Sequence, residues 1–129
     1  MCGIFGVHGH PDANHLAQLG LYSLQHRGQE SVGVVSIDPA GNARAVRNMG
    51  TLSEALALEV AKLPPGVMAV GHTRYSTAGT STIENAQPVL ARSKGGYITL
   101  AHNGNLINAA ELRMELEENG SIFASNSDS

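Results

Sequence analysis

The chain carries its apolar and β-branched residues in short runs that come mostly in neighbouring pairs, with helical patterns between the pairs. A turn-forming segment, Pro39-Ala40-Gly41-Asn42, separates two of these runs, which predicts that they pair as a hairpin. Strands that follow one another in this way favour antiparallel or mixed sheets covered by helices over a doubly wound parallel sheet, so we expect the α+β class. The runs that predict strands cover residues 2–7, 32–37, 43–48, 67–71, 89–92 and 97–101.

Three helices are expected between and after these strands. Asp12 is placed to cap the first helix, Thr51 with Glu54 the second, and Asn108 with Glu111 the third. Apolar residues then recur at helical spacing and predict the buried faces. These residues are Leu16, Leu19 and Leu24 in the first helix, Leu52, Leu56, Val60 and Leu63 in the second, and Leu112 and Leu116 in the third.

Composition excludes several classes of protein. With 129 residues the chain is long enough for one domain but not for two. The formal net charge is -3 and Lys and Arg do not cluster, which argues against a nucleic-acid partner. No apolar run approaches the roughly 18 to 20 residues that cross a bilayer, and the first residues lack the features of a signal peptide, so we expect no membrane partner and a cytoplasmic location.

Histidines offer one possible site, for a metal ion. His8 and His10 have strand spacing, while His72 and His102 follow two predicted strands. The sequence lacks the paired cysteine and His-Glu-x-x-His motifs of common metal sites, and it also lacks both glycine-rich phosphate-binding motifs. We therefore expect no metal and interpret His8 and His10 as polar residues at a strand end, with a metal site on them as an alternative.

Cys2 is the only cysteine, and it stands next to the initiator methionine. Removal of Met1, which is expected before a small residue, would place a thiol and a free α-amine on one residue. An α-amine has an ordinary pKa of about 7.7 and a thiol of about 8.5, so the amine can accept the thiol proton near neutral pH, either directly or through a water molecule. This is the arrangement of an N-terminal nucleophile. The alternative is a small apolar residue in the first strand.

Four further residues, at three places in the chain, suit acyl transfer, and each place also has a simpler explanation. Asn103 and Gly104 offer a side-chain amide and a backbone N–H for an oxyanion hole, or they form an ordinary hairpin turn. Arg74 follows a predicted buried strand and can bind a carboxylate with two hydrogen bonds, or it forms a surface ion pair. Asp128 can pair with an amine, or it is one more charge at a frayed terminus.

Six segments together carry a resemblance to a known family. In chain order they read MCGIFG (1–6), LQHRGQES (24–31), GHTRYSTAG (71–79), NAQP (85–88), AHNGNL (101–106) and SD (127–128). With them the chain resembles the N-terminal glutaminase domain of the amidophosphoribosyltransferase family, which are class II glutamine amidotransferases of the N-terminal nucleophile type. The resemblance spans nearly the whole chain. The HRGQES motif (26–31) is similar to the motif of the purine enzymes, whereas hexosamine-forming relatives typically have YRGYDS at this place.

The resemblance implies a role for each site residue. Cys2 would attack the carboxamide of glutamine, with its own α-amine as the general base. Asn103 and Gly104 would hold the oxyanion, while Arg74 would bind the α-carboxylate of glutamine and Asp128 its α-ammonium. Support for the pocket would come from Thr77 and Arg27, and its wall would be oriented by His72.

The resemblance also implies a fold and partners. The fold would be the αββα four-layer sandwich of the N-terminal nucleophile hydrolases, with residues 1–129 as its N-terminal part and the phosphoribosyltransferase domain absent. In the complete enzyme, that domain uses magnesium and adds the ammonia to phosphoribosyl pyrophosphate. The product is 5-phosphoribosylamine, in the first step of de novo purine biosynthesis.

The expected partners are therefore glutamine and the remainder of the enzyme chain, with a homo-oligomer when the enzyme is complete and no cofactor in this part. The alternative is a truncated, catalytically silent module that binds glutamine or a partner protein.

Overall fold

The computed structural model describes residues 1–52, 56–76 and 80–128. Every run expected to form a strand does so. The elements are the strands β1 (Gly3–His8), β2 (Ser31–Ile37), β3 (Ala43–Met49), β4 (Met68–Arg74), β5 (Val89–Ser93) and β6 (Gly96–Leu100), the helices α1 (Ala13–Leu24), α2 (Ala57–Ala61) and α3 (Ala109–Glu118), and the short 3-10 helices η1 (Gln25–Arg27) and η3 (Ile83–Asn85).

Four strands form the main sheet, in the order β1-β4-β2-β3, and all neighbours in it are antiparallel. The predicted hairpin is the β2–β3 pair, with Val34 opposite Val46. β5 and β6 form a separate antiparallel pair. The expected α+β class is therefore confirmed.

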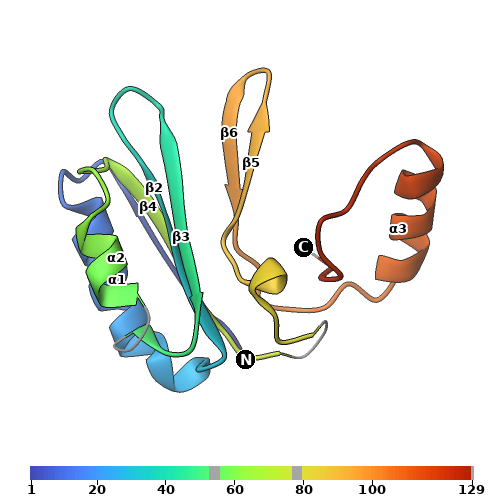
Figure 1. The fold of residues 1–129 in the computed structure, drawn as a ribbon, viewed down its shortest axis with the longest axis horizontal. Helices are drawn as coiled ribbons and strands as arrows, with labels where there is room; N and C mark the ends of the chain where they lie inside the picture. Colours follow the sequence, from blue (N-terminus) through green and yellow to red (C-terminus); the bar gives the residue numbers. More distant parts are fainter. Residues whose placement is uncertain (53–55, 77–79, 129) are drawn as a thin grey trace.

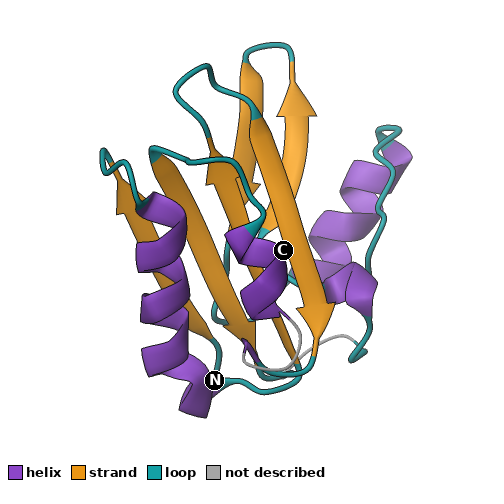
Figure 2. Ribbon diagram, turned by 60° about the vertical axis from the view of Figure 1, so that its left-hand side comes forward, coloured by secondary structure: helices purple, strands orange, loops and turns teal. Residues whose placement is uncertain are grey.

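The elements are arranged in four layers (Figure 1). α1 and α2 cover one face of the main sheet, the β5–β6 pair lies on the other side of that sheet, and α3 lies beyond the pair. Figure 2 shows the same arrangement after a turn of the molecule, with α1 and α2 in front of the main sheet and the β5–β6 pair behind it. The order of the layers is thus helix, sheet, sheet, helix.

α1 packs on the main sheet through small residues. Its buried positions include Ala13, Ala17, Gly20 and Leu21. Leu19, which was expected to face the core, is 50% exposed, so the predicted stripe was wrong at this position. Small side chains explain the difference, because they let the helix backbone approach the strands closely.

The second predicted helix buries the face that its sequence indicated. Leu52, Leu56 and Val60 are all at most 3% exposed and belong to the core cluster with Leu21 and with Val32 and Val34 of β2. The described part of this helix, α2, is shorter than the predicted one. Glu54 of the predicted capping box lies outside the described residues.

The third helix ends as predicted but does not bury its apolar face. Gly120 has a φ of +88°, and the N–H of Ser121 donates to the carbonyl of Leu116, which is the glycine-dependent end common in helices. Leu112 and Leu116 remain 38% and 45% exposed, so the prediction that they face the core was wrong for the chain as described. At the other end, Asn108 occupies the N-cap position without a side-chain cap hydrogen bond.

β4 is longer than its apolar run predicted. Polar residues His72, Thr73 and Arg74 continue the strand beyond Gly71 and are all buried. β4 lies between β1 and β2, so both of its edges are paired. These polar residues therefore lie at the end of the sheet where β1 begins, next to Cys2.

Within the described ranges, no helix combines the length and the apolar character needed to cross a membrane.

Candidate active site

Residues from distant parts of the chain line one small pocket at the end of the main sheet. Cys2 precedes β1, Arg74 ends β4, Gly104 follows β6, and Asp128 lies near the end of the chain. The complete lining is Cys2, Arg74, Tyr75, Gln87, His102, Gly104, Asn105, Ser127 and Asp128. The pocket therefore brings together four residues that the sequence had suggested separately for acyl transfer.

Cys2 is half-buried, and its polar atoms have defined contacts. Its backbone N–H donates to Oδ1 of Asn103 at 3.0 Å, and Nε of Arg27 donates to its carbonyl oxygen at 3.0 Å. Its Sγ lies 3.6 Å from the carbonyl oxygen of Tyr75. Because Oδ1 of Asn103 accepts from the Cys2 nitrogen, the Nδ2 hydrogens of that amide can donate elsewhere.

The segment that carries Asn103 and Gly104 is not a hairpin turn. It follows β6, whose last residue Leu100 pairs with Val89 at the beginning of β5, and it leads toward α3 instead of into a returning strand. The hairpin alternative was therefore wrong. Gly104 lines the pocket and Asn103 contacts Cys2, so groups that can donate hydrogen bonds lie beside a thiol.

Arg74 is 4% exposed, so the alternative of a surface ion pair was wrong. Its Nη1 donates to the carbonyl oxygens of Thr80 at 3.2 Å and Asn85 at 3.1 Å. These contacts fix the guanidinium at the pocket. A fixed guanidinium is well suited to a carboxylate, because its N–H donors form a planar fork.

The HRGQES segment supports this end of β4. The N–H of Glu30 donates to the carbonyl of Arg74 at 3.1 Å, and a Cβ on Gly28 would lie 2.6 Å from the backbone of Arg74. The carboxylate of Glu30 accepts a hydrogen bond from the hydroxyl of Ser76. Burial alone would raise the pKa of Glu30, but the hydrogen bonds from Ser76 and Ser81 outweigh burial and lower it.

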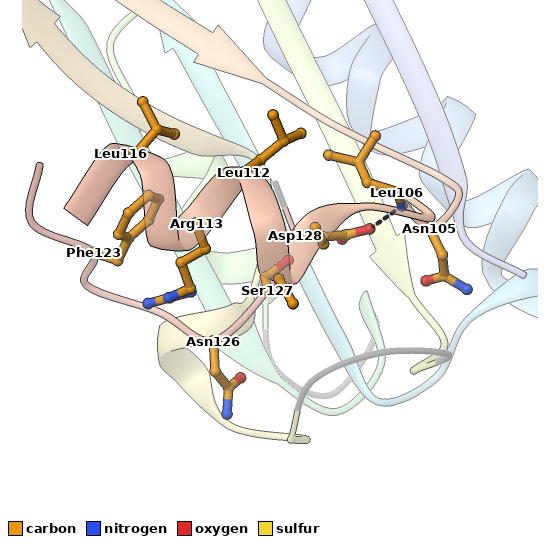
Figure 3. A pocket seen from close by; sticks show the side chains of 11 residues that line it. Asn105, Leu106, Leu112, Arg113, Leu116, Phe123, Asn126, Ser127 and Asp128 are labelled. Carbon is orange, nitrogen blue, oxygen red and sulfur yellow. Dashed lines mark hydrogen bonds between the residues drawn. The ribbon is translucent and has the colours of Figure 1, made fainter. Parts of the chain in front are cut away.

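Asp128 is held by the segment that follows β6. Its Oδ2 accepts the N–H of Leu106 at 2.7 Å, and its Oδ1 lies 3.7 Å from Nδ1 of His102. The side chain of Asp128 is 11% exposed. Figure 3 shows the bond to Leu106. These contacts do not fit the alternative of a charge on a frayed end.

His72 is fully buried and is not among the residues that line the pocket. Its Nε2 lies 3.2 Å from the carbonyl oxygen of His102, so the tautomer with a hydrogen on Nε2 donates this bond. Burial lowers the pKa of His72 from 6.5 to about 4. The imidazole is therefore neutral at neutral pH.

This lowered pKa predicts a pH-dependent stability. The unfolded chain binds a proton at His72 below pH 6.5 while the folded chain resists it down to about pH 4, so the free energy of unfolding falls as the pH falls through this window. Between pH 7.5 and 5.0 the contribution of His72 is about 2 kcal/mol, because a tenfold difference in proton affinity corresponds to about 1.4 kcal/mol. Urea unfolding at the two pH values measures it. His72→Gln should lose this part of the pH dependence, and an unchanged dependence in that variant would contradict the assignment.

The pocket includes residues to which the sequence had assigned no role. They are Tyr75, Gln87, His102, Asn105 and Ser127. Each lies inside one of the segments that carried the resemblance, and that is the signal that could have identified them. Thr77, to which a supporting role had been assigned, lies outside the described residues.

A second, roomier pocket shares part of its lining with the first, and Figure 3 shows the side chains that line it. Its walls are largely apolar, with Leu106, Leu112, Leu116 and Phe123. It shares Asn105, Ser127 and Asp128 with the Cys2 pocket but contains no nucleophilic thiol. The smaller pocket, which contains the thiol, is therefore the candidate active site.

The metal alternative gains no support. The Nδ1 of His10 accepts the N–H of Asp12 at 3.1 Å, and His8 lies at the end of β1. Among the described residues, no three His, Cys, Asp or Glu side chains gather in a way that would hold a metal ion.

Comparisons with known proteins identify the family to which this chain is similar. A family model described as a glutamine amidotransferase domain matches residues 59–129. Amidophosphoribosyltransferase of Archaeoglobus fulgidus is 50% identical over 99% of this chain, which covers 28% of that relative. Amidophosphoribosyltransferase of Lacticaseibacillus casei is 50% identical over 98% of this chain, which covers 66% of that relative. The chain thus spans only part of the length of either protein.

A solved structure shows the same fold. Glutamine phosphoribosylpyrophosphate amidotransferase from Bacillus subtilis, in complex with ADP and GMP, matches with a TM-score of 0.84 and 44% identity, over 95% of this chain and 26% of that one. The likeness confirms the expected αββα arrangement of the N-terminal nucleophile hydrolases, of which this chain covers a part.

Proposed function

The chain belongs to the family of glutamine amidotransferase domains, and from this premise we propose that it releases ammonia from the side-chain amide of glutamine with Cys2 as an N-terminal nucleophile. The observation that carries the proposal is the pocket in which Cys2 lies with Arg74 and Asp128, a thiol beside one cationic and one anionic group. An amino acid bound by its α-carboxylate and α-ammonium needs such a pair of opposite charges.

The first step begins once Met1 has been removed. Met1 is 69% exposed, so its peptide bond is accessible to a processing enzyme. The freed α-amine of Cys2 accepts the Sγ proton, and Sγ then attacks the carboxamide carbon of glutamine. Oδ1 of Asn103, 3.0 Å from the Cys2 nitrogen, accepts one amine N–H and orients the amine lone pair toward the thiol. Arg27 holds the carbonyl of the same residue.

The second step resolves the tetrahedral intermediate. Nδ2 of Asn103 and the N–H of Gly104 donate to its oxyanion. The protonated amine of Cys2 then gives its proton to the departing nitrogen, the C–N bond breaks, and ammonia leaves with a γ-glutamyl thioester remaining on Sγ. Water gives a proton to the same amine and attacks the thioester carbon. The C–S bond then breaks, glutamate is released, and Sγ takes the proton back from the amine, which restores the free thiol.

The charged residues select the substrate. Arg74 binds the α-carboxylate of glutamine, and Asp128 binds its α-ammonium. Thr77 has a supporting role at the pocket. His72 does not line the pocket, and it orients the pocket wall through its hydrogen bond to the carbonyl of His102.

The activity of the whole enzyme belongs to this proposal as well. The relatives are longer proteins named amidophosphoribosyltransferases. We propose that the chain is the N-terminal part of a class II glutaminase domain, and that the remainder of the enzyme uses the ammonia to convert phosphoribosyl pyrophosphate to 5-phosphoribosylamine, in the first step of de novo purine biosynthesis. Magnesium would act in that remainder, and the complete enzyme would be a cytoplasmic homo-oligomer.

The role of Asp128 gives the first test. In the full-length protein, kcat/KM for ammonia release is measured with glutamine and with the monoamide of glutaric acid, which lacks the α-ammonium. Asp128→Asn should lower kcat/KM for glutamine by about 10²-fold or more, because the ammonium loses its charged partner. Asparagine can still accept the N–H of Leu106, so the local backbone keeps its contact.

The second substrate makes this test specific. The parent protein should prefer glutamine over the monoamide, and Asp128→Asn should lose most of that preference. Asp12→Asn is the matched control, because Asp12 is exposed and makes no side-chain cap hydrogen bond. An unchanged preference in Asp128→Asn would remove Asp128 from substrate binding.

A further inference from the structure

The backbone of His102 is held from both sides by buried side chains. Its N–H donates to Oε1 of Gln87 at 2.7 Å, and its carbonyl oxygen accepts from Nε2 of His72 at 3.2 Å. Gln87 is 6% exposed and His72 is fully buried. We call this pair of hydrogen bonds the His102 clamp. Its two side chains come from different segments of the chain, because His72 belongs to β4 of the main sheet and Gln87 precedes β5.

The clamp replaces strand pairing at this point. Leu100 is the last residue of β6 and pairs with Val89, the first residue of β5, so the β5–β6 ladder ends before His102. Without a neighbouring strand, the backbone groups of His102 depend on side chains for partners. Two buried polar side chains thus bind the backbone of one residue in an irregular segment. We infer from this that the fold holds the segment after β6 in a defined position.

The main sheet is shaped to accept Gln87. Gly33 of β2 lies opposite His72 in the sheet, and a Cβ there would collide with the carbonyl oxygen of Gln87. Nη1 of Arg47 donates to the carbonyl of Ala86 at 3.3 Å, which ties the same segment to β3. The segment of Gln87 thus packs on the main sheet, to which His72 also belongs, so both side chains of the clamp are positioned by the same sheet.

We propose that Gln87 and His72 are positioning residues for glutamine hydrolysis, which through His102 set the orientation of Asn103 and Gly104 toward the oxyanion. This inference rests on the proposed function and extends it to residues that do not touch the reacting atoms. The carbonyl that His72 holds is bonded directly to the nitrogen of Asn103. Any rotation of this peptide therefore moves both the Asn103 side chain and the N–H of Gly104.

The expected effect is on turnover and not on substrate affinity. A displacement of about 1 Å in a catalytic group costs about 10²-fold in rate. Loss of either clamp bond should therefore lower kcat by about 10- to 100-fold, while KM for glutamine stays within about threefold, because Arg74 and Asp128 are not part of the clamp.

Two pairs of variants in the full-length protein separate positioning from general damage. Gln87→Met removes the acceptor at similar size, whereas Gln87→Glu keeps an oxygen in its place. His72→Leu removes the donor, whereas His72→Gln keeps an N–H donor at similar reach. The Met and Leu variants should show the loss of kcat, and the Glu and Gln variants should stay within about threefold of the parent protein. The rate of Cys2 alkylation by iodoacetamide should fall by less than about threefold in any of them, because alkylation forms no oxyanion and depends on Asn103 only through the Cys2 amine.

A second readout does not depend on activity. Hydrogen exchange of peptides that cover residues 101–104, followed by mass spectrometry, should be at least about tenfold faster in Gln87→Met than in the parent, because the His102 N–H loses its acceptor. A parent protein that releases no ammonia would overturn the proposed function, and exchange would then decide the clamp alone. Unchanged exchange in Gln87→Met, or a kcat within twofold of the parent in both Gln87→Met and His72→Leu, would overturn the inference.

Discussion

Substitution of Cys2 by alanine in the full-length protein should reduce glutamine-dependent ammonia release by about 10⁶-fold, to the level of a blank reaction, because the covalent route then has no nucleophile. The loss should appear in kcat. Binding of glutamine should remain, since Arg74 and Asp128 are intact, and isothermal titration calorimetry measures it. Cys2→Ala removes only the sulfur from a half-buried side chain, so the packing at the beginning of β1 should persist.

A second change tests the other half of the nucleophile. An additional residue that keeps Cys2 inside the chain leaves its thiol intact but turns its amine into an amide, which cannot accept a proton. This variant should be as inactive as Cys2→Ala. Release above a tenth of the parental rate from either variant would show that another group attacks glutamine or accepts the proton.

Asn103→Ala should lower kcat by about 10²- to 10³-fold, with KM for glutamine within about threefold, because loss of one oxyanion donor acts on the transition state. Steady-state ammonia release as a function of glutamine concentration measures both quantities. The variant also loses the oxygen that accepts the Cys2 N–H at 3.0 Å, so part of the loss belongs to the amine.

Asn103→Asp separates these two roles. Aspartate keeps an oxygen for the Cys2 nitrogen but offers no N–H to the oxyanion, and its charge repels the developing negative charge. We expect its kcat to fall at least as far as that of Asn103→Ala. A rate within twofold of the parent protein in both variants would remove Asn103 from the oxyanion hole.

Local patterns predicted the elements of the fold well because their causes are local. The turn at residues 39–42 indicated the β2–β3 hairpin, and the spacing of Leu52, Leu56 and Val60 indicated a buried helical face. The same reasoning failed at Leu19 and Leu116, which are exposed. Which face of a helix is buried depends on the layer that covers it, and the spacing of leucines carries no information about that layer.

The site was predicted residue by residue, but its connections were not. Cys2 and Asn103 are 101 positions apart, and their hydrogen bond exists because β1 and the segment after β6 reach the same end of the main sheet. Periodicity ended the fourth strand at residue 71, since polar residues usually mark a loop. Both neighbours of β4 pair with His72 and Thr73, and β2 also pairs with Arg74, so this polar end is part of the sheet and is buried. Gln87 accepts a hydrogen bond from His102, which lies 15 positions further along the chain, and no local sequence pattern indicates this contact.

The central claim is that Cys2 acts as an N-terminal nucleophile toward glutamine. The most direct test is the mass of the N-terminal peptide after the full-length protein reacts with a diazoketone analogue of glutamine. We expect this peptide to begin at Cys2, to carry one adduct on it, and to be protected by excess glutamine. An active protein that retains Met1, or an adduct on any other residue with Cys2 unmodified, would contradict it.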